Sequence, residues 1–340
     1  MEFLADYGIF LLKVITIAIA VTVPLLLIVG SSKTKTPSKG SLVVKNLSKK
    51  YEEMGSSIRN SQLNSKELKK YNKELQKKKK TEEKRPSKEE SVYVLNFNGD
   101  IQASEVTKLK HEINAILLSD TKCKEVVIKV ESGGGSAYAY GLCAAELRRL
   151  VDNKIKLTVC IDKVAASGGY LMSCVASKIV AAPWAIVGSI GVIAQLPNFH
   201  RLLKKNSIDF EMHTAGEFKR TLTTLGENTE AGRKKFKSEL EDLHLIFKDF
   251  IKEQRPQVDT KIVATGEVWQ GEKAIEVGLI DALGTSDDYL VELSKKLKLF
   301  EIDYVEKKNL TERFAFSAQL LIEKSILKFY DIVNRDRFIS

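Results

Sequence analysis

Histidine and cysteine are scarce in this chain of 340 residues, which has four of each. No two cysteines form a Cys-x-x-Cys pair, and no histidine stands at ligand spacing near them, so a structural zinc site is not expected. The cysteines lie among apolar or small residues, which is typical of buried free thiols rather than of a disulfide framework; they are Cys123, Cys143, Cys160 and Cys174. The sequence therefore predicts neither a bound metal nor a cofactor.

Outside one segment the chain also lacks any excess of charge. Its formal net charge is +10, but residues 31–90 alone hold 18 basic and 8 acidic residues, which accounts for the whole excess. No module of interleaved basic and aromatic residues is present, so nucleic acid is not an expected partner. The basic segment instead indicates contact with anionic lipid headgroups beside a membrane span.

One long apolar run occurs near the N-terminus. Residues 8–30 provide about the 20 apolar positions that a helix needs to cross a bilayer. Lys13 is the only charge in this run and lies near one end of it. The start is acidic, with Glu2 and Asp6, and no Ala-x-Ala site follows, which favours an uncleaved anchor over a signal peptide. The basic residues beyond the run would place the rest of the chain in the cytoplasm.

The composition divides the chain into four parts. Residues 1–30 form the expected transmembrane anchor, and residues 31–90 form a basic juxtamembrane tether, partly helical or disordered. Residues 91–300 have the apolar periodicity of a folded domain. Residues 301–340 form a C-terminal extension that is basic and apolar by turns and carries no functional signal.

Strand and helix patterns alternate within residues 91–300, which predicts an α/β domain with a parallel sheet built from βαβ crossovers. The expected strands are 92–97, 126–130, 157–161 and 178–182, with a further one near 210–212. The expected helices are 104–118, 139–151, 230–254 and a short one that stops at Gly278.

The stretch 179–199 is apolar enough to suggest a second membrane span. Breakers interrupt it at short intervals; they are Pro183, Gly188, Gly191 and Pro197. Between them lie two runs rich in β-formers, each of the length of a buried strand. We therefore interpret this stretch as part of the sheet.

A serine between small residues is the first candidate for chemistry. Ser167 follows Ala165 and Ala166 and precedes Gly168 and Gly169. Small neighbours leave a hydroxyl approachable, and glycines let backbone amides come close to a developing oxyanion. The alternative is a tight strand-to-helix turn in which Ser167 only caps the helix.

A glycine cluster at 133–135 stands at the equivalent place in the preceding βα unit. It lacks the Gly-x-Gly-x-x-Gly spacing and the Gly-Lys-Ser/Thr sequence of phosphate-binding loops. The remaining interpretations of this cluster are a structural turn and a pair of amides that binds an oxyanion. Loops at adjacent strand ends of a parallel sheet lie side by side, so an amide of Gly134 or Gly135 and that of Gly168 could supply two donors.

A nucleophilic serine requires a base. Three of the four histidines lie in amphipathic helices or in a loop bounded by proline, and His213 has no aspartate placed to orient it. A lysine can act as the base if burial removes its charge. Lys219 is one candidate, and the alternative for it is an ordinary solvated loop lysine.

Four short motifs occur in order along the chain: Ser132-Gly133-Gly134-Gly135, Ala166-Ser167-Gly168-Gly169-Tyr170, Gly188-Ser189-Ile190-Gly191-Val192 and Gly216-x-x-Lys219. The runs 214–229 and 265–281 follow at compatible spacing. Together these motifs resemble the signal peptide peptidase A family of serine proteases. The anchor, the tether and the run 214–229 resemble the SohB branch of that family, and the match covers nearly the whole chain.

The resemblance implies a role for each motif. Ser167 would be the nucleophile and Lys219 the general base of a Ser–Lys dyad. Ser189 would hold the lysine amine, and Gly168 would shape the oxyanion hole with Gly134 and Gly135. Gly133 stands where the family often has proline, which leaves open which glycine amide is used.

The resemblance also implies a ClpP/crotonase-like fold of repeated ββα units that assembles into a homo-oligomeric ring or dome. We therefore expect a single-pass serine endopeptidase of the bacterial inner membrane, acting on peptides or unfolded protein segments through an acyl-enzyme. The family implies a catalytic domain on the periplasmic side, whereas the charge pattern implies the cytoplasmic side. The alternatives are a crotonase-like acyl-CoA enzyme and a catalytically idle membrane scaffold.

Overall fold

The computed structural model describes residues 10, 12–13, 15–16, 40–83 and 90–306. The chain divides into two units, one made of Leu42–Val305 and the other of Met1–Ser41 with Glu306–Ser340. Most of the predicted anchor at 8–30, and the C-terminal extension beyond Glu306, lie outside the described residues. In the part of the chain that is described, no helix has both the length and the apolar character needed to cross a membrane.

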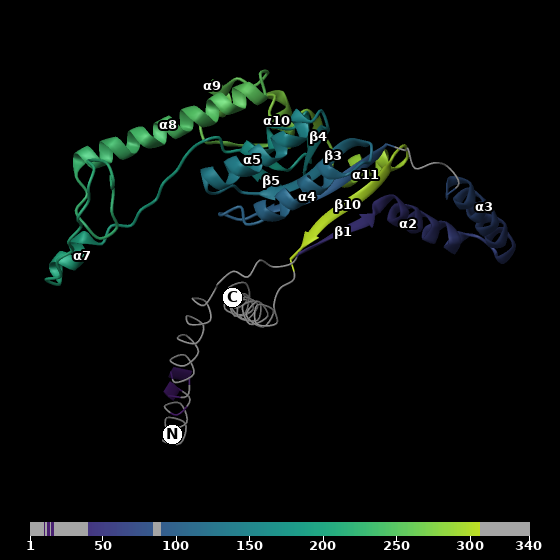
Figure 1. Cartoon of the computed structure of the whole chain (residues 1–340), viewed down its shortest axis with the longest axis horizontal. Coiled ribbons are helices and arrows are strands. Elements are labelled where there is room, and N and C mark those ends of the chain that lie inside the picture. The colour runs from purple at the N-terminus through teal and green to yellow at the C-terminus, as the bar shows by residue number, and fades with distance from the viewer. Residues whose placement is uncertain (1–9, 11, 14, 17–39, 84–89, 307–340) are drawn as a thin grey trace, which may run out of the picture. The chain divides into compact units, whose positions relative to one another are not determined.

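Within the described residues, ten strands form a single sheet (Figure 1). They are β1 (Ser41–Asn46), β2 (Ser91–Gly99), β3 (Cys123–Ser132), β4 (Lys156–Ile161), β5 (Val164–Ala166), β6 (Lys178–Ala181), β7 (Ile186–Gly188), β8 (Val268–Gln270), β9 (Ala282–Leu283) and β10 (Lys298–Val305). The main path is β1-β10-β2-β3-β4-β6-β9, and its pairs from β10 to β9 run parallel. Beside this path, β5 pairs with β3 and β7, and β7 pairs antiparallel with β8.

The described helices connect and cover these strands. They are α2 (Leu47–Gln62), α3 (Ser65–Glu83), α4 (Val106–Leu118), α5 (Ala137–Asp152), α6 (Gly168–Ser173), α7 (His200–Lys205), α8 (Glu230–Gln254), α9 (Thr260–Val263), α10 (Gly271–Glu276) and α11 (Ser286–Ser294). The order β2-α4-β3-α5-β4 is the predicted series of βαβ crossovers. The consecutive strands β4 and β5, followed by α6, form one ββα unit of the kind that the family resemblance implied.

Both faces of the sheet are buried, because successive side chains of a strand point to opposite sides. In β2, Tyr93, Leu95 and Phe97 face a large core shared with α4, α5 and α6. Val92 and Val94 face a smaller core that α2 and α11 close. This two-sided burial explains the near-continuous apolar runs that predicted the strands.

The predicted strands at 92–97, 126–130, 157–161 and 178–182 correspond to β2, β3, β4 and β6, and the stretch 179–199 contains β6 and β7 rather than a membrane helix. The predicted helices correspond to α4, α5, α8 and α10. The strand expected near 210–212 does not form. Phe210 and Met212 are exposed there, and no neighbouring strand supplies hydrogen bonds.

The compact unit begins earlier than the expected boundary at residue 91. β1 is the edge strand beside β10, and Leu47 at the start of α2 is buried in the smaller core. The Ser48 hydroxyl accepts a hydrogen bond from the Leu299 amide at 2.9 Å. Part of the segment that we expected to be a tether therefore belongs to the sheet, and β10 extends the sheet past residue 300. β1 is exposed along its whole length, so its place in the sheet depends on its pairing with β10.

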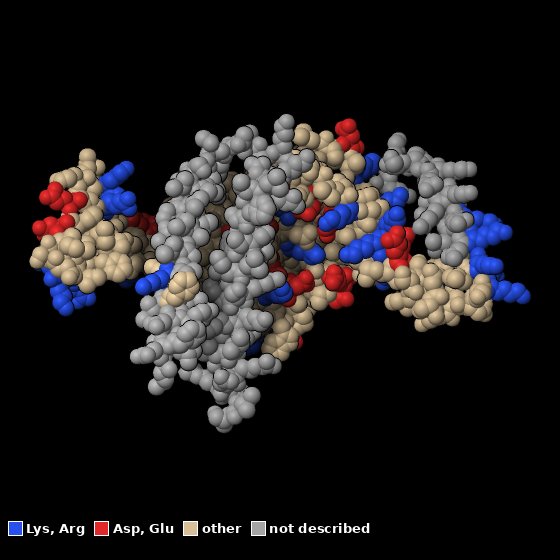
Figure 2. Space-filling view, turned by 90° about the horizontal axis from the view of Figure 1, so that it is seen from below, with Lys and Arg blue, Asp and Glu red and all other residues tan. Residues whose placement is uncertain are grey.

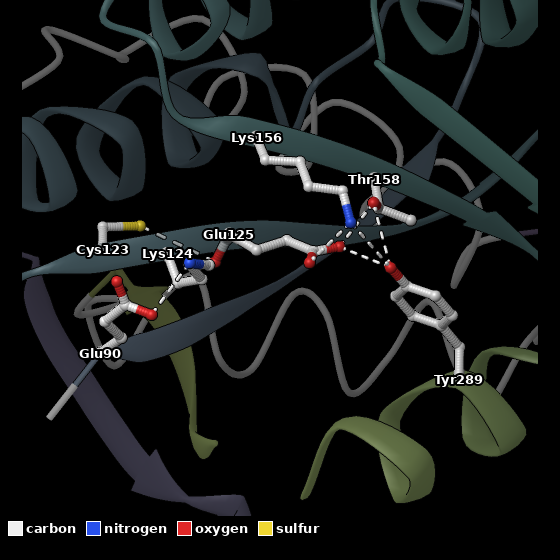
Figure 3. A network of polar contacts seen from close by, with 7 residues as sticks. All are labelled: Glu90, Cys123, Lys124, Glu125, Lys156, Thr158 and Tyr289. Atoms are coloured by element: carbon white, nitrogen blue, oxygen red, sulfur yellow. Dashed lines mark hydrogen bonds and ion pairs between the residues drawn. The ribbon is translucent and has the colours of Figure 1, made fainter. Parts of the chain in front are cut away.

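A buried carboxylate fastens α11 to the sheet (Figure 3). Glu125 of β3 accepts hydrogen bonds from Thr158 Oγ1 at 2.6 Å, Tyr289 OH at 2.6 Å and Lys156 Nζ at 3.0 Å. Burial is the main cause that raises the pKa of the Tyr289 phenol, and its hydrogen bond to Glu125 adds to this. Both carboxylate oxygens accept hydrogen bonds, which offsets the cost of burying them.

A second buried carboxylate is less well compensated. Glu112 of α4 is fully buried, and its Oε1 accepts only the Tyr304 amide, at 2.9 Å. Within the described residues its Oε2 has no hydrogen-bond partner. Lys108 Nζ lies 4.0 Å from Oε1 but bonds more closely to Asp303, at 3.0 Å. Burial therefore raises the pKa of Glu112 from 4.5 to about 7.

This raised pKa predicts a pH-dependent stability. Between pH 4.5 and 7 the folded chain keeps a proton that the unfolded chain has released, so stability falls as the pH rises through this window. Glu112→Gln cannot ionise and should be more stable than the wild type at pH 8, by up to about 3 kcal/mol, but not at pH 4.5. Urea unfolding at the two pH values measures this. Glu241→Gln, an exposed change on α8, should have no such effect, and an equal pH slope in Glu112→Gln and wild type would contradict the assignment.

Candidate active site

Three parallel strands end side by side and bring together three of the predicted motifs. In the register, Ser132 of β3 lies opposite Ala165 of β5, and Ala166 of β5 lies opposite Gly188 of β7. The next residues along each chain segment therefore meet at one edge. This edge gathers the glycine loop after β3, Ser167 after β5 and Ser189 after β7.

Ser167 is held in a strained turn between β5 and α6. Its φ is 50° and its ψ is −117°, a conformation that side-chain-bearing residues rarely adopt. The Ser167 amide donates to the Gly188 carbonyl at 2.7 Å, and its carbonyl accepts from the Leu171 amide at 2.9 Å. The side chain is half-buried and makes no capping hydrogen bond to α6. The alternative role as a simple helix cap is therefore not what the geometry supports.

The glycine loop touches this turn directly. Gly134 has φ +88°, and a Cβ added to it would lie 2.7 Å from the Ala166 carbonyl oxygen, the Gly168 amide nitrogen and the Ser167 Cβ. Only glycine permits such an approach. The loop at 133–135 and the serine loop thus lie in contact, as the strand order predicted.

The amides of this loop are not equivalent. The Gly134 amide donates to Ser132 Oγ at 3.0 Å, so it is already engaged. Gly133 and Gly135 are exposed, and in the described structure neither amide has a hydrogen-bond partner. Gly134 therefore provides the close contact, while an oxyanion donor from this loop has to come from an amide beside it.

Ser189 occupies the matching position one strand further on. Its φ is 51°, and its amide donates to the Glu267 carbonyl at 2.7 Å. The preceding Gly188 has φ +94°, and a Cβ there would lie 2.8 Å from the Trp269 ring. The closing motif 265–281 thus packs beneath Ser189, which sequence spacing alone does not reveal.

The same closing motif supports the helix that follows Ser167. Tyr170 OH donates to the Leu279 carbonyl at 2.9 Å. Asp281 accepts two hydrogen bonds at 2.8 Å from the buried Arg255 and one at 2.7 Å from the Ile179 amide. One aspartate therefore joins the end of α8 to β6, and the tyrosine joins α6 to the same turn.

Lys219 is not brought to Ser167 within this chain. It lies in the exposed stretch 213–220, and its neighbour Phe218 packs against Lys235 Nζ at 5.5 Å, near the N-terminal end of α8. Only the C-terminal part of α8, at Phe247 and Ile251, enters the core. In Figure 1, α7 and the start of α8 lie well to one side of the sheet. Among the described residues no hydrogen bond joins Lys219 to Ser167 or Ser189.

Other chemical groups do not form a competing site. His213 is exposed and lies 3.4 Å from Glu211. The described part of the chain contains no cluster of three His, Cys, Asp or Glu residues that could hold a metal ion. All four cysteines are free, and burial raises the pKa of the Cys143, Cys160 and Cys174 thiols to about 12. A cavity of about 250 Å³ at the ends of β2 and β3 does not include Ser167.

Comparison with protein families agrees with the motifs. The model of the peptidase family S49 N-terminal region matches residues 2–147, and that of peptidase family S49 matches residues 149–300. The chain belongs to peptidase family S49. It is a serine peptidase, and the family resemblance expected from the sequence is confirmed.

Curated relatives extend this likeness over most of the length. The chain is 45% identical over 330 residues to "Probable protease SohB" of Haemophilus influenzae, covering 94% of each. It is 50% identical over 243 residues to the protein of the same name from Buchnera aphidicola of Acyrthosiphon pisum, covering 72% of each. Among solved structures it matches the 1510-N membrane-bound stomatin-specific protease in complex with a substrate peptide. That match has a TM-score of 0.41 and 13% identity, and covers 67% of this chain and 96% of the other.

The close contact at Gly134 gives a direct test of this site. Gly134→Ala should destabilise the fold by about 1–3 kcal/mol, because its Cβ meets backbone atoms and its φ is left-handed. It should also displace Ser167 and abolish peptide hydrolysis. Gly133→Ala is the matched control, since nothing lies within 4 Å of its added Cβ, and it should change stability by less than about 0.5 kcal/mol. Urea unfolding and a peptidase assay measure both, and equal behaviour of the two variants would contradict the packing described here.

Proposed function

We propose that this chain is a membrane-anchored serine endopeptidase that cleaves peptides or unfolded protein segments through a Ser–Lys dyad. Ser167 Oγ attacks the scissile carbonyl carbon and forms an acyl-enzyme, the leaving amine takes up the proton that the base removed from Ser167, and water then hydrolyses the ester. The observation that carries the proposal is the strained turn at Ser167, which lies in contact with the glycine loop. Strain of this kind is typical of nucleophile turns, where it presents the hydroxyl at a strand end.

The oxyanion hole is assigned to the amides of Gly168 and Gly135. Gly168 follows the nucleophile, and its amide nitrogen lies next to Gly134. The Gly135 amide has no hydrogen-bond partner in the described structure, whereas that of Gly134 is bonded to Ser132. Two preorganised hydrogen-bond donors are the usual means of stabilising a tetrahedral intermediate. Each donor contributes substantially to the rate enhancement.

Lys219 acts as the general base from a neighbouring copy of the chain. A base has to come within hydrogen-bond reach of the hydroxyl, and Lys219 stands on an extended arm away from its own Ser167. The arm also exposes several apolar side chains, which a second copy would cover; they include Phe199, Leu202, Ile208, Phe210 and Phe218. Contact with a second copy would also bury the lysine, and burial disfavours the charged form of an amine that has to accept a proton. Ser189, beside Ser167, would then hold the lysine amine.

Substitution of the dyad tests this mechanism. Ser167→Ala and Lys219→Ala should each reduce peptide hydrolysis by roughly 10⁴-fold or more, whereas Lys237→Ala, an exposed change on α8, should keep full activity. A mixture of equal amounts of the two inactive variants, co-assembled, should recover about one quarter of wild-type activity, because that share of sites pairs an intact serine with an intact lysine.

Two results would contradict the proposal. Full activity in Lys219→Ala would contradict the assignment of Lys219 to the dyad. An inactive mixture of the two variants would contradict the supply of the lysine by a neighbouring copy. A serine-reactive fluorophosphonate separates the peptidase from other functions, because an acyl-CoA enzyme of crotonase type or an idle scaffold would leave Ser167 unlabelled.

Membrane attachment rests on the apolar run at 8–30 and the basic segment that follows it. The described part of this segment includes α3, whose sequence is rich in lysine. Figure 2 shows Lys and Arg side chains gathered at the end of the unit where α3 lies. Such a surface suits anionic lipid headgroups close to the anchor.

The catalytic unit is expected on the periplasmic side of the inner membrane, as in the family, although the basic residues after the anchor favour the cytoplasm. Large domains translocate largely regardless of charge, so the basic segment does not decide the side. Protease added to spheroplasts should therefore degrade residues 90–306. Protection of these residues until the membrane is permeabilised would place the unit in the cytoplasm.

A further inference from the structure

Tyr140 is linked to both loops that form the proposed oxyanion hole, directly to one and through Ser132 to the other. It lies in the first turn of α5, directly after the glycine loop, and is fully buried. Its hydroxyl lies 2.5 Å from Ser132 Oγ at the end of β3, and Ser132 in turn holds the Gly134 amide. Its ring lies against Gly168, directly after β5.

The Tyr140 hydroxyl belongs to a chain of hydrogen bonds in which every donor and acceptor is defined. Tyr140 OH donates to the Asp100 carbonyl at 2.7 Å, so its only proton is used there. Ser132 Oγ lies 2.5 Å from the same hydroxyl and therefore donates to it. Ser132 Oγ in turn accepts the Gly134 amide at 3.0 Å. The order is Gly134 N–H, Ser132 O–H, Tyr140 O–H and the Asp100 carbonyl, and each group has one defined orientation.

The ring fixes the other loop. A Cβ added to Gly168 would lie 2.5 Å from Tyr140 Cγ and 2.6 Å from Cδ2, so the ring lies directly against the Gly168 backbone. Phe97 holds the ring from another side, with a centroid distance of 6.3 Å and an edge-on angle of 74°. The ring has no room to tilt without moving Gly168.

We propose that Tyr140 is a positioning residue that couples the two donor loops, with its ring setting the Gly168 amide and its hydroxyl, through Ser132, setting the loop at 133–135. This inference rests on the proposed function, because it takes Ser167 as the nucleophile. By holding the Gly134 amide, the hydrogen-bond chain also turns the glycine loop so that the adjacent amide is left for substrate. Tyr140 does not itself touch the reacting atoms.

Tyr140→Phe isolates the hydroxyl, since it keeps the ring against Gly168. Ser132→Ala breaks the same chain one step nearer to Gly134. Each should lower kcat for a peptide substrate by about 10- to 100-fold, with KM changed by less than about 2-fold, because small displacements of the donors act on the transition state. The double variant should be no slower than the worse single one, since both changes interrupt one chain. Tyr138→Phe is the matched control, as this exposed tyrosine on the same helix should leave kcat unchanged.

A peptide aldehyde separates positioning from a general loss of structure. It forms a tetrahedral adduct with the nucleophile, so its inhibition constant should rise by the same factor as kcat/KM falls. If kcat and the aldehyde constant are unchanged in both variants, the proposal is wrong. If both variants lose kcat but bind the aldehyde as tightly as the wild type, it is also wrong.

Folding and the proposed function are checked on the same proteins. Thermal unfolding curves show whether each variant is folded at the assay temperature. If Tyr140→Phe is unfolded at that temperature, the result for Ser132→Ala decides the proposal. Fluorophosphonate labelling of Ser167 in the wild type tests the proposed function separately. An unlabelled wild type would overturn that function, whereas a labelled wild type with two fully active variants would overturn only the role of Tyr140.

Discussion

The parallel pairing of β3, β5 and β7 is the constraint on which the site depends. Two register pairs, Ser132 with Ala165 and Ala166 with Gly188, decide which residues stand next to one another at the strand ends. A slip of one residue would turn Ser167 to the other face of its short strand. Both β5 and β7 have only three residues, so the hydrogen bonds at their ends carry much of this specificity. The bond from the Ser167 amide to the Gly188 carbonyl is one of them, and it joins the turn at Ser167 to the strand that leads to Ser189.

Such short strands need support from outside the sheet, and the closing motif provides it. β8 pairs with β7, Trp269 lies beneath Gly188, and the Glu267 carbonyl accepts the Ser189 amide. Tyr170 and Arg255 reach the turn at 278–281 from α6 and α8. Arg255 is almost fully buried, and its charge is matched by Asp281, so removal of Asp281 would leave a buried charge unpaired. Residues about 100 positions after the serine thus fix the geometry around it.

Much of this fold follows from the sequence, because its signals are local. Apolar runs predicted β2, β3, β4 and β6, and the spacing of apolar residues predicted α4, α5 and α8. The proximity of Gly134 to Ser167 also follows, since loops at adjacent parallel strand ends meet. β1 and β10 were not predicted, because each pairs only with strands that lie far from it in the chain. The strand expected near 210–212 had a suitable composition but no neighbour with which to pair. The hydrogen-bond chain through Tyr140 was also not predicted, since a tyrosine on a helix gives no sign of what its hydroxyl meets.

The position of Lys219 within a single chain does not explain the role proposed for it. Strain at Ser167, a glycine loop against it and Ser189 beside it are complete within one copy, and all are held by rigid strands. The lysine instead lies on an exposed arm between β7 and the part of α8 that enters the core. A base on a mobile or separate element makes the nucleophile inert until the two meet, which is useful in a peptidase that is synthesised among proteins it could cleave. In the proposed dyad, assembly would supply three things at once: cover for the apolar side chains of the arm, the desolvation that a lysine base requires, and a proton acceptor for Ser167.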